Sequence, residues 1–186
     1  VTALDIPALD FTADQTRGCA ITNIQFSDLS TSVNTKVAWL WDFGDGNTSS
    51  LPNPLHTYTT DGVYTVRLTV TDVNGCLDSL TKTNYIRLSH PIADFGFDQT
   101  IVCPNEPIGV TFSDSTIGDT TISSWNWNFG DGTTSTLTNP SHSYGIPGNY
   151  SISLEVIDVL GCRDTITKPT AIQVRNAPTP AFAQSD

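Results

Sequence analysis

The sequence predicts an all-β protein made of two tandem domains, each a β-sandwich. Three observations lead to this prediction: apolar and polar side chains alternate strictly in several segments, turn residues recur at short intervals, and the chain contains an internal repeat. Alternation with a period of two places every second side chain on one face of a strand. Several short strands within about 85 residues, separated by Gly, Pro and Asn, are typical of a β-sandwich.

The repeat is most visible in one six-residue motif. Trp41–Gly46 reads WDFGDG, and Trp127–Gly132 reads WNFGDG, 86 positions later. Self-similarity at a fixed offset indicates copies of one structural unit. We therefore predict domains at 1–89 and 90–176. The last segment, 177–186, is a linker or the start of a third repeat, because PTPAF in this segment resembles PIADF at the start of the second copy.

The first predicted strand of the repeat carries its tryptophans. Trp39, Trp41 and Phe43 share one parity, so their side chains are expected on one face of a strand. The Gly-Asp-Gly that follows tolerates tight-turn geometry. In this turn Asp45 and, in the second copy, Asp131 are expected to accept hydrogen bonds from backbone amides.

The second predicted strand has the clearest alternation. Tyr64–Val70 and Tyr150–Val156 alternate apolar and polar residues without a break, so one face of each strand is expected in a core. Asp72–Gly75 follows the first of these strands and contains Asn-Gly, the strongest short hairpin signal. The sequence therefore predicts a hairpin at this point.

Composition and charge exclude several classes of protein. The chain has 186 residues, a formal net charge of −11 and no Met. A surface this acidic repels nucleic acid and anionic lipid. The longest wholly apolar run, Val37–Trp41, is far shorter than the roughly 20 residues of a membrane helix. We expect a secreted monomer, part of a longer precursor, that neither binds nucleic acid nor inserts into a membrane.

The motifs of each copy resemble a known family. W-x-W-[DN]-F-G-D-G is followed by N-P-x-H-x-Y, G-x-Y-x-[VI]-x-L-x-V and D-V-x-G-C, in the same order in both copies. This set resembles the polycystic kidney disease (PKD) domain over nearly all of both copies. The resemblance implies an immunoglobulin-like β-sandwich with an extracellular role. The Cys-containing G-C-x-D form resembles the tandem repeats of large Bacteroidetes-type bacterial surface proteins.

No residue set in the sequence indicates catalysis. Asp-Phe-Gly also occurs in protein kinases, but the Gly-rich phosphate loop, the paired Lys and the H-R-D segment of kinases are missing. No Ser-His-Asp or Cys-His arrangement repeats within a copy. His56 and His142 occupy equivalent positions in separate domains, so we expect a turn or packing role for them. We predict that the chain is not an enzyme.

Each copy contains two cysteines at matching places. They are Cys19 and Cys76 in the first copy, and Cys103 and Cys162 in the second. Four cysteines allow three pairings, and the repeat favours one bond within each domain. Zinc is the competing interpretation, but neither copy has C-x-x-C or a nearby His pair. We predict disulfides Cys19–Cys76 and Cys103–Cys162, which imply an oxidising compartment.

The resemblance raises the question of whether the domains bind calcium. Some PKD domains bind calcium through an acidic D-x-D-G segment. The equivalent segments here begin at Asp28 and Asp114 and read DLS and DST, so the second acid is missing in both copies. We therefore expect no cofactor, and calcium binding is the weaker alternative.

Trp39 and Trp125 are the candidates for ligand stacking. Two tryptophans of the same parity on one short strand are hard to bury fully, so these side chains are expected to be partly exposed. Exposed Trp can stack on sugar rings, whereas the competing interpretation is that the indoles shield the rim of the sandwich.

Together these features predict a non-catalytic extracellular segment that acts as a spacer, stalk or display module of a cell-surface adhesin. Its partners would be the neighbouring repeats of the same chain. The join at 89–91 is too short for a flexible tether, which favours this role. The alternative is an accessory module of a secreted polysaccharide- or protein-degrading enzyme, with a polysaccharide or a protein as its ligand.

Overall fold

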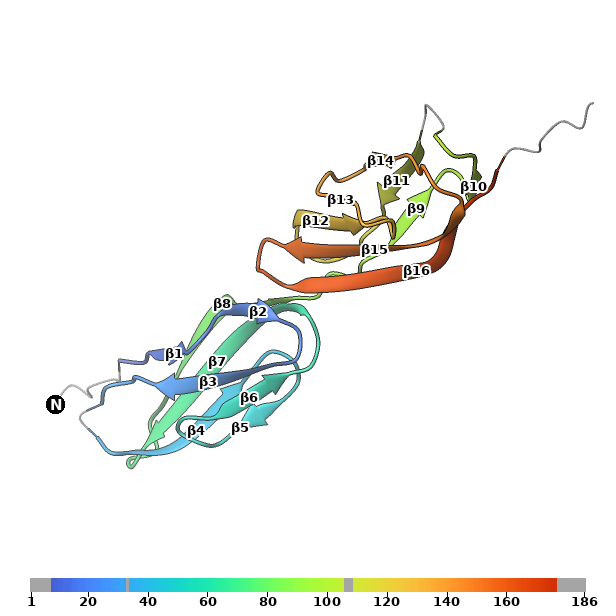
Figure 1. Ribbon diagram of the computed structural model, residues 1–186. Coiled ribbons are helices and arrows are strands. Elements are labelled where there is room, and N and C mark those ends of the chain that lie inside the picture. The colour runs from blue at the N-terminus through green and yellow to red at the C-terminus, as the bar shows by residue number, and fades with distance from the viewer. Residues whose placement is uncertain (1–7, 33, 106–108, 177–186) are drawn as a thin grey trace, which may run out of the picture. The chain divides into compact units, whose positions relative to one another are not determined.

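The chain forms two compact units, Val1–His90 and Pro91–Asp186. The computed structural model describes residues 8–32, 34–105 and 109–176, and every regular element in these ranges is a strand (Figure 1). Each unit is a β-sandwich of the immunoglobulin-like type, so the fold class predicted from the sequence is confirmed. The predicted linker or third repeat at 177–186 lies outside the described residues.

The first unit pairs a three-stranded sheet with a five-stranded sheet. The strand orders are β1-β3-β6 and β2-β8-β7-β4-β5. Neighbouring strands are antiparallel except β2 and β8, which run parallel. The strands are β1 (Phe11–Ala13), β2 (Arg17–Cys19), β3 (Thr22–Asp28), β4 (Lys36–Asp42), β5 (Thr48–Ser49), β6 (Leu55–Tyr58), β7 (Gly62–Asp72) and β8 (Leu77–Ser89).

The second unit repeats this arrangement. Its strand orders are β14-β11-β9 and β10-β16-β15-β12-β13, and β10 runs parallel to β16. The strands are β9 (Phe95–Phe97), β10 (Ile101–Val102), β11 (Val110–Asp114), β12 (Ile122–Asn128), β13 (Thr134–Ser135), β14 (Ser141–His142), β15 (Gly148–Asp158) and β16 (Arg163–Val174).

Strand β7 shows how the alternating pattern is used. Tyr64, Val66, Leu68 and Val70 point into the core and are at most 8% exposed. The intervening side chains lie on the outer face of the five-stranded sheet, where they are half-buried or exposed. The predicted strand Tyr64–Val70 therefore lies within β7, and its period-two pattern identifies the buried face correctly.

The hairpin between β7 and β8 is held by the buried carboxylate of Asp72. Its Oδ1 accepts the backbone N–H groups of Asn74 and Cys76, each at 2.9 Å, and its Oδ2 accepts the side-chain amide of Asn34 at 2.8 Å. Burial opposes ionisation of this carboxyl, but these hydrogen bonds outweigh it and lower the pKa of Asp72. The carboxylate thus satisfies two backbone donors of the turn and the side-chain amide of Asn34.

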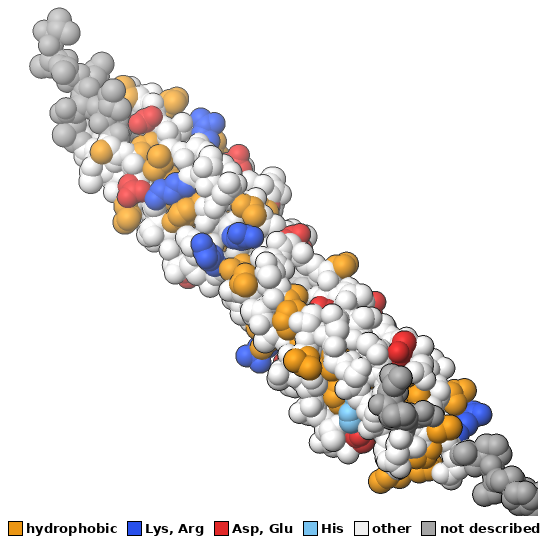
Figure 2. Space-filling view, turned by 90° about the horizontal axis from the view of Figure 1, so that it is seen from above, with side chains coloured by type: hydrophobic (Ala, Val, Ile, Leu, Met, Phe, Trp, Pro, Cys, Tyr) orange, Lys and Arg blue, Asp and Glu red, His pale blue; other side chains and the backbone are white. Residues whose placement is uncertain are grey.

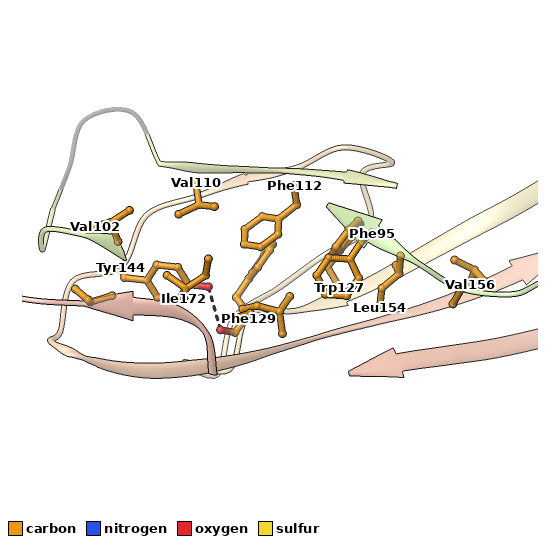
Figure 3. Close-up of a cluster of buried hydrophobic side chains, with 14 residues drawn as sticks. Phe95, Val102, Val110, Phe112, Trp127, Phe129, Tyr144, Leu154, Val156 and Ile172 are labelled. Carbon is orange, nitrogen blue, oxygen red and sulfur yellow. Dashed lines mark hydrogen bonds between the residues drawn. The ribbon is translucent and has the colours of Figure 1, made fainter. Parts of the chain in front are cut away.

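Aromatic side chains fill the space between the two sheets of each unit. In the second unit, Phe112 contacts Trp127 and Phe129, with ring centroids 5.7 and 5.3 Å apart (Figure 3). The hydroxyl of Tyr144 donates to the carbonyl of Phe129, shown as the dashed line in Figure 3. A fully buried aromatic ring of this size stabilises the fold by roughly 2–3 kcal/mol, so this cluster is a main source of stability.

Candidate functional site

The repeated WDFGDG and WNFGDG motifs each form a tight turn after a tryptophan-bearing strand. In the first domain the turn joins β4 to β5, and the N–H of Gly44 donates to Asp42 Oδ1 at 2.9 Å. In the second domain the N–H of Gly130 donates to Asn128 Oδ1, also at 2.9 Å. Asp and Asn both present an oxygen acceptor at this position, which explains why the motif tolerates the exchange.

The two glycines of the first turn meet different surroundings. Gly44 has φ +81° and Gly46 has φ +88°, values that favour glycine. A Cβ on Gly44 would lie 2.4 Å from the carbonyl oxygen of Thr65, whereas a Cβ on Gly46 would meet open space. Glycine is therefore required at Gly44 by both the positive φ and the lack of space, and at Gly46 by the positive φ alone.

Asp45 and His56 form a side-chain pair beside this turn. Asp45 Oδ1 accepts the N–H of Asn47 at 3.0 Å, and its Oδ2 lies 2.8 Å from His56 Nε2. The imidazole stacks on Phe43 with a centroid distance of 4.0 Å and an interplanar angle of 3°. Burial opposes ionisation of the carboxyl, but the bonds from Asn47 and His56 lower the pKa of Asp45.

The second domain contains the equivalent pair, Asp131 and His142. The Oδ2–Nε2 distance is 2.7 Å, and the imidazole stacks on Phe129 at 4.3 Å. Considered one by one in the sequence, the aspartates and the histidines do not reveal this pairing. The signal for it was the equal spacing, since 11 residues separate the two side chains in both copies.

The geometry of the Asp–His pair indicates a structural role rather than a catalytic one. In a catalytic triad, the acid and the nucleophile contact different nitrogens of the imidazole. Thr133 Oγ1 approaches His142 at 3.3 Å, but it contacts the same Nε2 that faces Asp131. Ring stacking on Phe129 fixes the imidazole further. The pair therefore links the turn to the β11–β14 sheet without offering an activated hydroxyl.

Trp39 and Trp125, the candidates for ligand stacking, are half-buried. The indole N–H of Trp39 donates to Asp28 Oδ2 at 2.7 Å, and that of Trp125 donates to Asp114 Oδ2 at the same distance. Both rings also pack against the core of their own domain. These contacts are the ones expected if the indoles shield the rim of the sandwich. Stacking of a sugar ring on Trp39 or Trp125 stays a prediction.

The same contacts bear on the calcium hypothesis, because Asp28 and Asp114 are the acids of the expected motif. Asp28 Oδ2 also accepts Lys36 Nζ at 2.6 Å, and its Oδ1 accepts the N–H of Ser30 at 2.8 Å. Burial opposes ionisation here too, but these partners lower the pKa of Asp28. Within 8–32, 34–105 and 109–176, no three His, Cys, Asp or Glu side chains cluster closely enough to hold a metal ion.

The predicted disulfide pairing within each domain is wrong, because Cys76 and Cys103 are free thiols on the surface. Cys19 ends β2 opposite Ser89, the last residue of β8, whereas Cys76 precedes the first residue of β8. A 13-residue strand is roughly 40 Å long, and a disulfide requires Cα atoms within about 7 Å. The two cysteines of a domain therefore lie at opposite ends of its sheet.

The arrangement in the second domain is the same. Cys103 follows β10, whose Val102 pairs with Val174 at the end of β16, and Cys162 directly precedes β16. Cys19 and Cys162 are disulfide-bonded.

The comparison with protein families agrees with this repeated geometry. The family described as PKD domain matches residues 5–88 and again residues 89–174. The chain belongs to the PKD domain family. Both copies of the motif set, including the turn and the strand that follows it, lie inside the matched regions.

Other PKD-containing proteins resemble parts of this chain. Collagenase ColA of Bacillus cereus is 42% identical over 83 residues, which are 44% of this chain and 8% of that protein. Pre-pro-metalloprotease PrtV of Vibrio cholerae is 34% identical over 135 residues, 70% of this chain and 14% of that protein. The chain thus spans less than one sixth of the length of these relatives. They are not Bacteroidetes-type surface proteins, so the similarity is not specific to that lineage.

A solved structure resembles one PKD domain at a time. The crystal structure of the PKD1 domain from Vibrio cholerae metalloprotease PrtV is 34% identical and covers 44% of this chain and 95% of that chain, with a TM-score of 0.39. The PKD1 domain of Vibrio anguillarum Epp is 31% identical and covers 44% of this chain and 94% of that chain, also with a TM-score of 0.39.

The surface of the PKD domains carries isolated hydrophobic side chains. On the face shown in Figure 2, hydrophobic side chains are scattered among other side chains and backbone, with acidic and basic groups between them. In the described part of the chain, no helix is long and apolar enough to span a membrane.

One open depression on the first PKD domain is lined by two arginines. Arg17 and Arg87 are direct partners on the parallel strands β2 and β8, and the depression between β2, β7 and β8 has a volume of about 470 Å³. Among the residues that the structure describes, neither guanidinium has an ion-pair partner. The equivalent depression of the second PKD domain carries Ile101 and Gln173 instead, so only the first combines two positive charges.

Proposed function

We propose that the chain is a non-catalytic accessory segment of a secreted protein-degrading enzyme, in which two PKD domains space and present other parts of the polypeptide. One observation carries this proposal. The polar side chains that recur at equivalent positions, above all the Asp–His and Asp–Trp pairs, make their contacts within their own domain. Recurring groups used in this way stabilise a module and leave no shared reactive centre.

The relatives favour this proposal over the adhesin stalk. Two of them are collagenases or metalloproteases by name, and the matched regions are small parts of those proteins. A small segment within a large enzyme fits the accessory-module alternative better than the adhesin stalk. The adhesin hypothesis, with its Bacteroidetes-type parent, has no comparable support.

An extracellular location is part of the proposal. The disulfide-bonded state of Cys19 and Cys162 supports it, because disulfides persist in oxidising compartments. The net charge of −11 also suits a protein that avoids nucleic acid and anionic membranes.

The polypeptide that contains the chain provides the direct test. We expect its full reading frame to encode a peptidase domain, and the 186-residue chain alone to leave fluorescent casein uncleaved. A reading frame made of many PKD repeats without a peptidase domain would contradict this proposal and favour the adhesin stalk. Cleavage of casein by the purified chain would show that a catalytic site exists in these two domains.

A second candidate function is recognition of a protein substrate through Arg17 and Arg87. Like charges placed directly opposite on neighbouring strands repel each other, and a bound carboxylate would relieve this repulsion through charge-assisted hydrogen bonds. Although the whole chain is acidic, this local pair of positive charges would attract an acidic peptide segment.

Co-sedimentation with insoluble collagen tests this second function. Binding through the arginines should weaken as salt increases and should fall at least tenfold in Arg17→Ala/Arg87→Ala. The matched control, Ile101→Ala/Gln173→Ala, changes the equivalent depression of the second domain and should bind normally. If both double variants bound collagen equally, or if the unmodified chain did not bind it, recognition through the arginines would be excluded. The spacing role would then be the remaining function.

A further inference from the structure

Three exposed side chains form one row across the outer face of the larger sheet of the first domain. Arg17 of β2 is the direct partner of Arg87 of β8, and Arg87 is the direct partner of Val63 of β7. Directly paired residues point to the same face of a sheet, and neighbouring strands lie about 5 Å apart. The open depression described above contains these three side chains, which we call the arginine row, together with Asn84.

The arginine row holds positive charges that the first domain does not use itself. Three of the five Lys and Arg side chains of this domain bond to its own polar side chains: Lys36 to Asp28, Lys82 to Asp10 and Arg67 to Ser79. The other two are Arg17 and Arg87, and neither has an ion-pair partner in the described ranges. Two uncommitted guanidinium groups therefore stand together at one place.

A carboxylate fits between two guanidinium groups. Each of its oxygens can accept N–H groups from one guanidinium, and charge-assisted bonds of this kind are roughly twice as strong as neutral ones. Two sources could supply the carboxylate. One is an Asp or Glu side chain within an acidic segment, and the other is the α-carboxylate at the C-terminus of a peptide.

The charge of the rest of the domain favours the C-terminus of a peptide. The first domain has nine aspartates beside its five basic residues. A segment with several acidic residues would bind at the arginine row but would be repelled by the remaining surface. A chain end brings a single negative charge, which the two arginines can neutralise.

Val63 provides a second argument for the C-terminus. Its side chain is 52% exposed and lies next to Arg87 in the row. In the last residue of a peptide, the side chain and the α-carboxylate share one Cα, so an aliphatic side chain can contact Val63 while the carboxylate bonds to the arginines. An internal Asp or Glu has polar peptide groups at this place instead. The exposed carboxamide of Asn84 can both donate to and accept from the last peptide group.

We propose that the arginine row binds the C-terminal residue of a peptide whose last side chain is aliphatic. The equivalent row of the second domain consists of Ile101, Gln173 and Asn149, and Gln173 Nε2 donates to Asn149 Oδ1 at 3.1 Å. The site is therefore confined to the first domain. This inference rests on the proposed function, because each cut in a protein substrate creates a new C-terminus. The domain would then hold the enzyme on substrate that has already been cut.

Calorimetric titration of the unmodified chain with three short peptides is the first test. The peptides are acetyl-Ala-Gly-Ala-Leu as the free acid, the same peptide as its C-terminal amide, and acetyl-Ala-Glu-Ala-Leu amide, whose negative charge is on a side chain. The free acid should bind at one site per chain and about tenfold more tightly than either amide. If the Glu peptide bound as tightly as the free acid, or if no peptide bound, the proposal would be wrong. The reading-frame and casein tests of the proposed function do not depend on these peptides, so each idea can fail alone.

Substitutions in the row locate the site. Arg17→Ala/Arg87→Ala should weaken binding of the free acid by about tenfold or more, and unchanged affinity would overturn the proposal. Val63→Asn installs the residue of the second domain and should weaken binding of the Leu peptide but not of the same peptide ending in Gly. An equal effect on both peptides would contradict the contact between Val63 and the last side chain.

The second domain offers the reciprocal variant. Ile101→Arg/Gln173→Arg/Asn149→Val rebuilds the arginine row there and should raise the number of free-acid binding sites per chain from one to two. A folded variant that still bound a single peptide would show that the row is not sufficient for binding, against the proposal.

Discussion

The two PKD domains place one aromatic ring of their cores on different strands. Ala13 and Tyr85 in the first domain stand where Phe97 and Ala171 stand in the second. In the first domain, the Tyr85 ring meets Phe11 edge-on at 5.4 Å, and its hydroxyl accepts the N–H of Ala13 at 3.0 Å. The ring therefore comes from β8, the last strand of the first domain.

In the second domain, the first strand supplies the ring instead. Phe97 of β9 lies 6.3 Å from Phe95 and 6.2 Å from Phe112 between ring centroids, while Ala171 fills the position on β16. A large residue and a small residue have exchanged places between two facing positions. The comparison shows that this part of the sandwich requires a certain side-chain volume and accepts it from either strand.

A second difference concerns the carboxylate that receives the indole. Lys36 in the first domain adds an ion pair to Asp28, and Ile122 in the second domain packs against the core at the equivalent position. The Trp–Asp hydrogen bond of 2.7 Å is the same in both. The contact that both domains keep belongs to the shared fold, whereas the ion pair is an addition of the first domain.

The largest expected effect tests the turn, where the two domains agree. Gly44→Ala should destabilise the first domain by about 4 kcal/mol, because the new Cβ meets the Thr65 carbonyl and the backbone has positive φ. Gly130→Ala should do the same in the second domain, where the Cβ lies 2.5 Å from the Ser151 carbonyl. Urea unfolding followed by tryptophan fluorescence measures both.

Gly46→Ala is the matched control, since this position has the same positive φ but open space around it. Its cost should be about 1 kcal/mol. If Gly44→Ala and Gly46→Ala were equally destabilising, the close approach to Thr65 would not contribute.

The intermediate effect tests the exchange of aromatic rings. Tyr85→Ala should destabilise the first domain by about 2 kcal/mol, because it removes a half-buried ring and its packing on Phe11. Adding Ala13→Phe, which installs the arrangement of the second domain, should recover at least half of this loss. A double-mutant cycle in urea measures the coupling.

Ala13→Phe alone is the informative control, because it should overpack a site that Tyr85 already fills. Additive effects of the two substitutions would mean that the two positions do not share one space, and the volume argument would then fail.

The smallest expected effect tests the added ion pair. Lys36→Ile should change stability at pH 7 by less than about 1 kcal/mol, since Lys36 is partly exposed. Its main effect should appear in acid. The pKa of Asp28 lies below its ordinary value of 3.8 in the folded protein, so the unfolded chain takes up the proton first and stability is lost as the pH falls below about 4.

Removing the ammonium of Lys36 should raise the folded pKa of Asp28 and make this loss shallower. Urea midpoints measured between pH 2.5 and 7 give the comparison, with Ile122→Lys in the second domain as the reciprocal variant. If the stability of Lys36→Ile fell with decreasing pH as steeply as that of the unmodified chain, the other partners of Asp28 would be sufficient to lower its pKa.

Features that depend on local chain geometry could be predicted from the sequence. The alternation in Tyr64–Val70 identified a strand and its buried face, and the Asn-Gly after Asp72 identified a hairpin. The hydrogen bond from the Asn47 N–H to Asp45 follows from residues two positions apart. Each of these features needs only neighbouring residues, so periodicity and turn chemistry determine it.

Features that depend on which strand ends meet in space could not be predicted. The disulfide prediction paired Cys19 with Cys76 because they share a repeat, but β2 runs parallel to β8 and places them at opposite ends. The Asp45–His56 pair was missed because it joins the β4–β5 turn to β6 in the opposite sheet. The equal spacing in both copies marks the Asp and His positions as equivalent, but strand order and direction decide which side chains and which cysteines meet.

The hydroxyl of Tyr58, which donates to the carbonyl of Phe43 at 2.9 Å, limits how alkaline a solution the first domain tolerates. Burial, together with the nearby Asp45 charge, raises the pKa of this phenol well above its ordinary value. In the second domain, burial and the Asp131 charge raise the pKa of Tyr144 in the same way. The unfolded chain loses these two protons near pH 10, whereas the folded chain retains them, so stability decreases as the pH rises further. Phenolate absorbance should therefore appear for these two rings only as each sandwich opens.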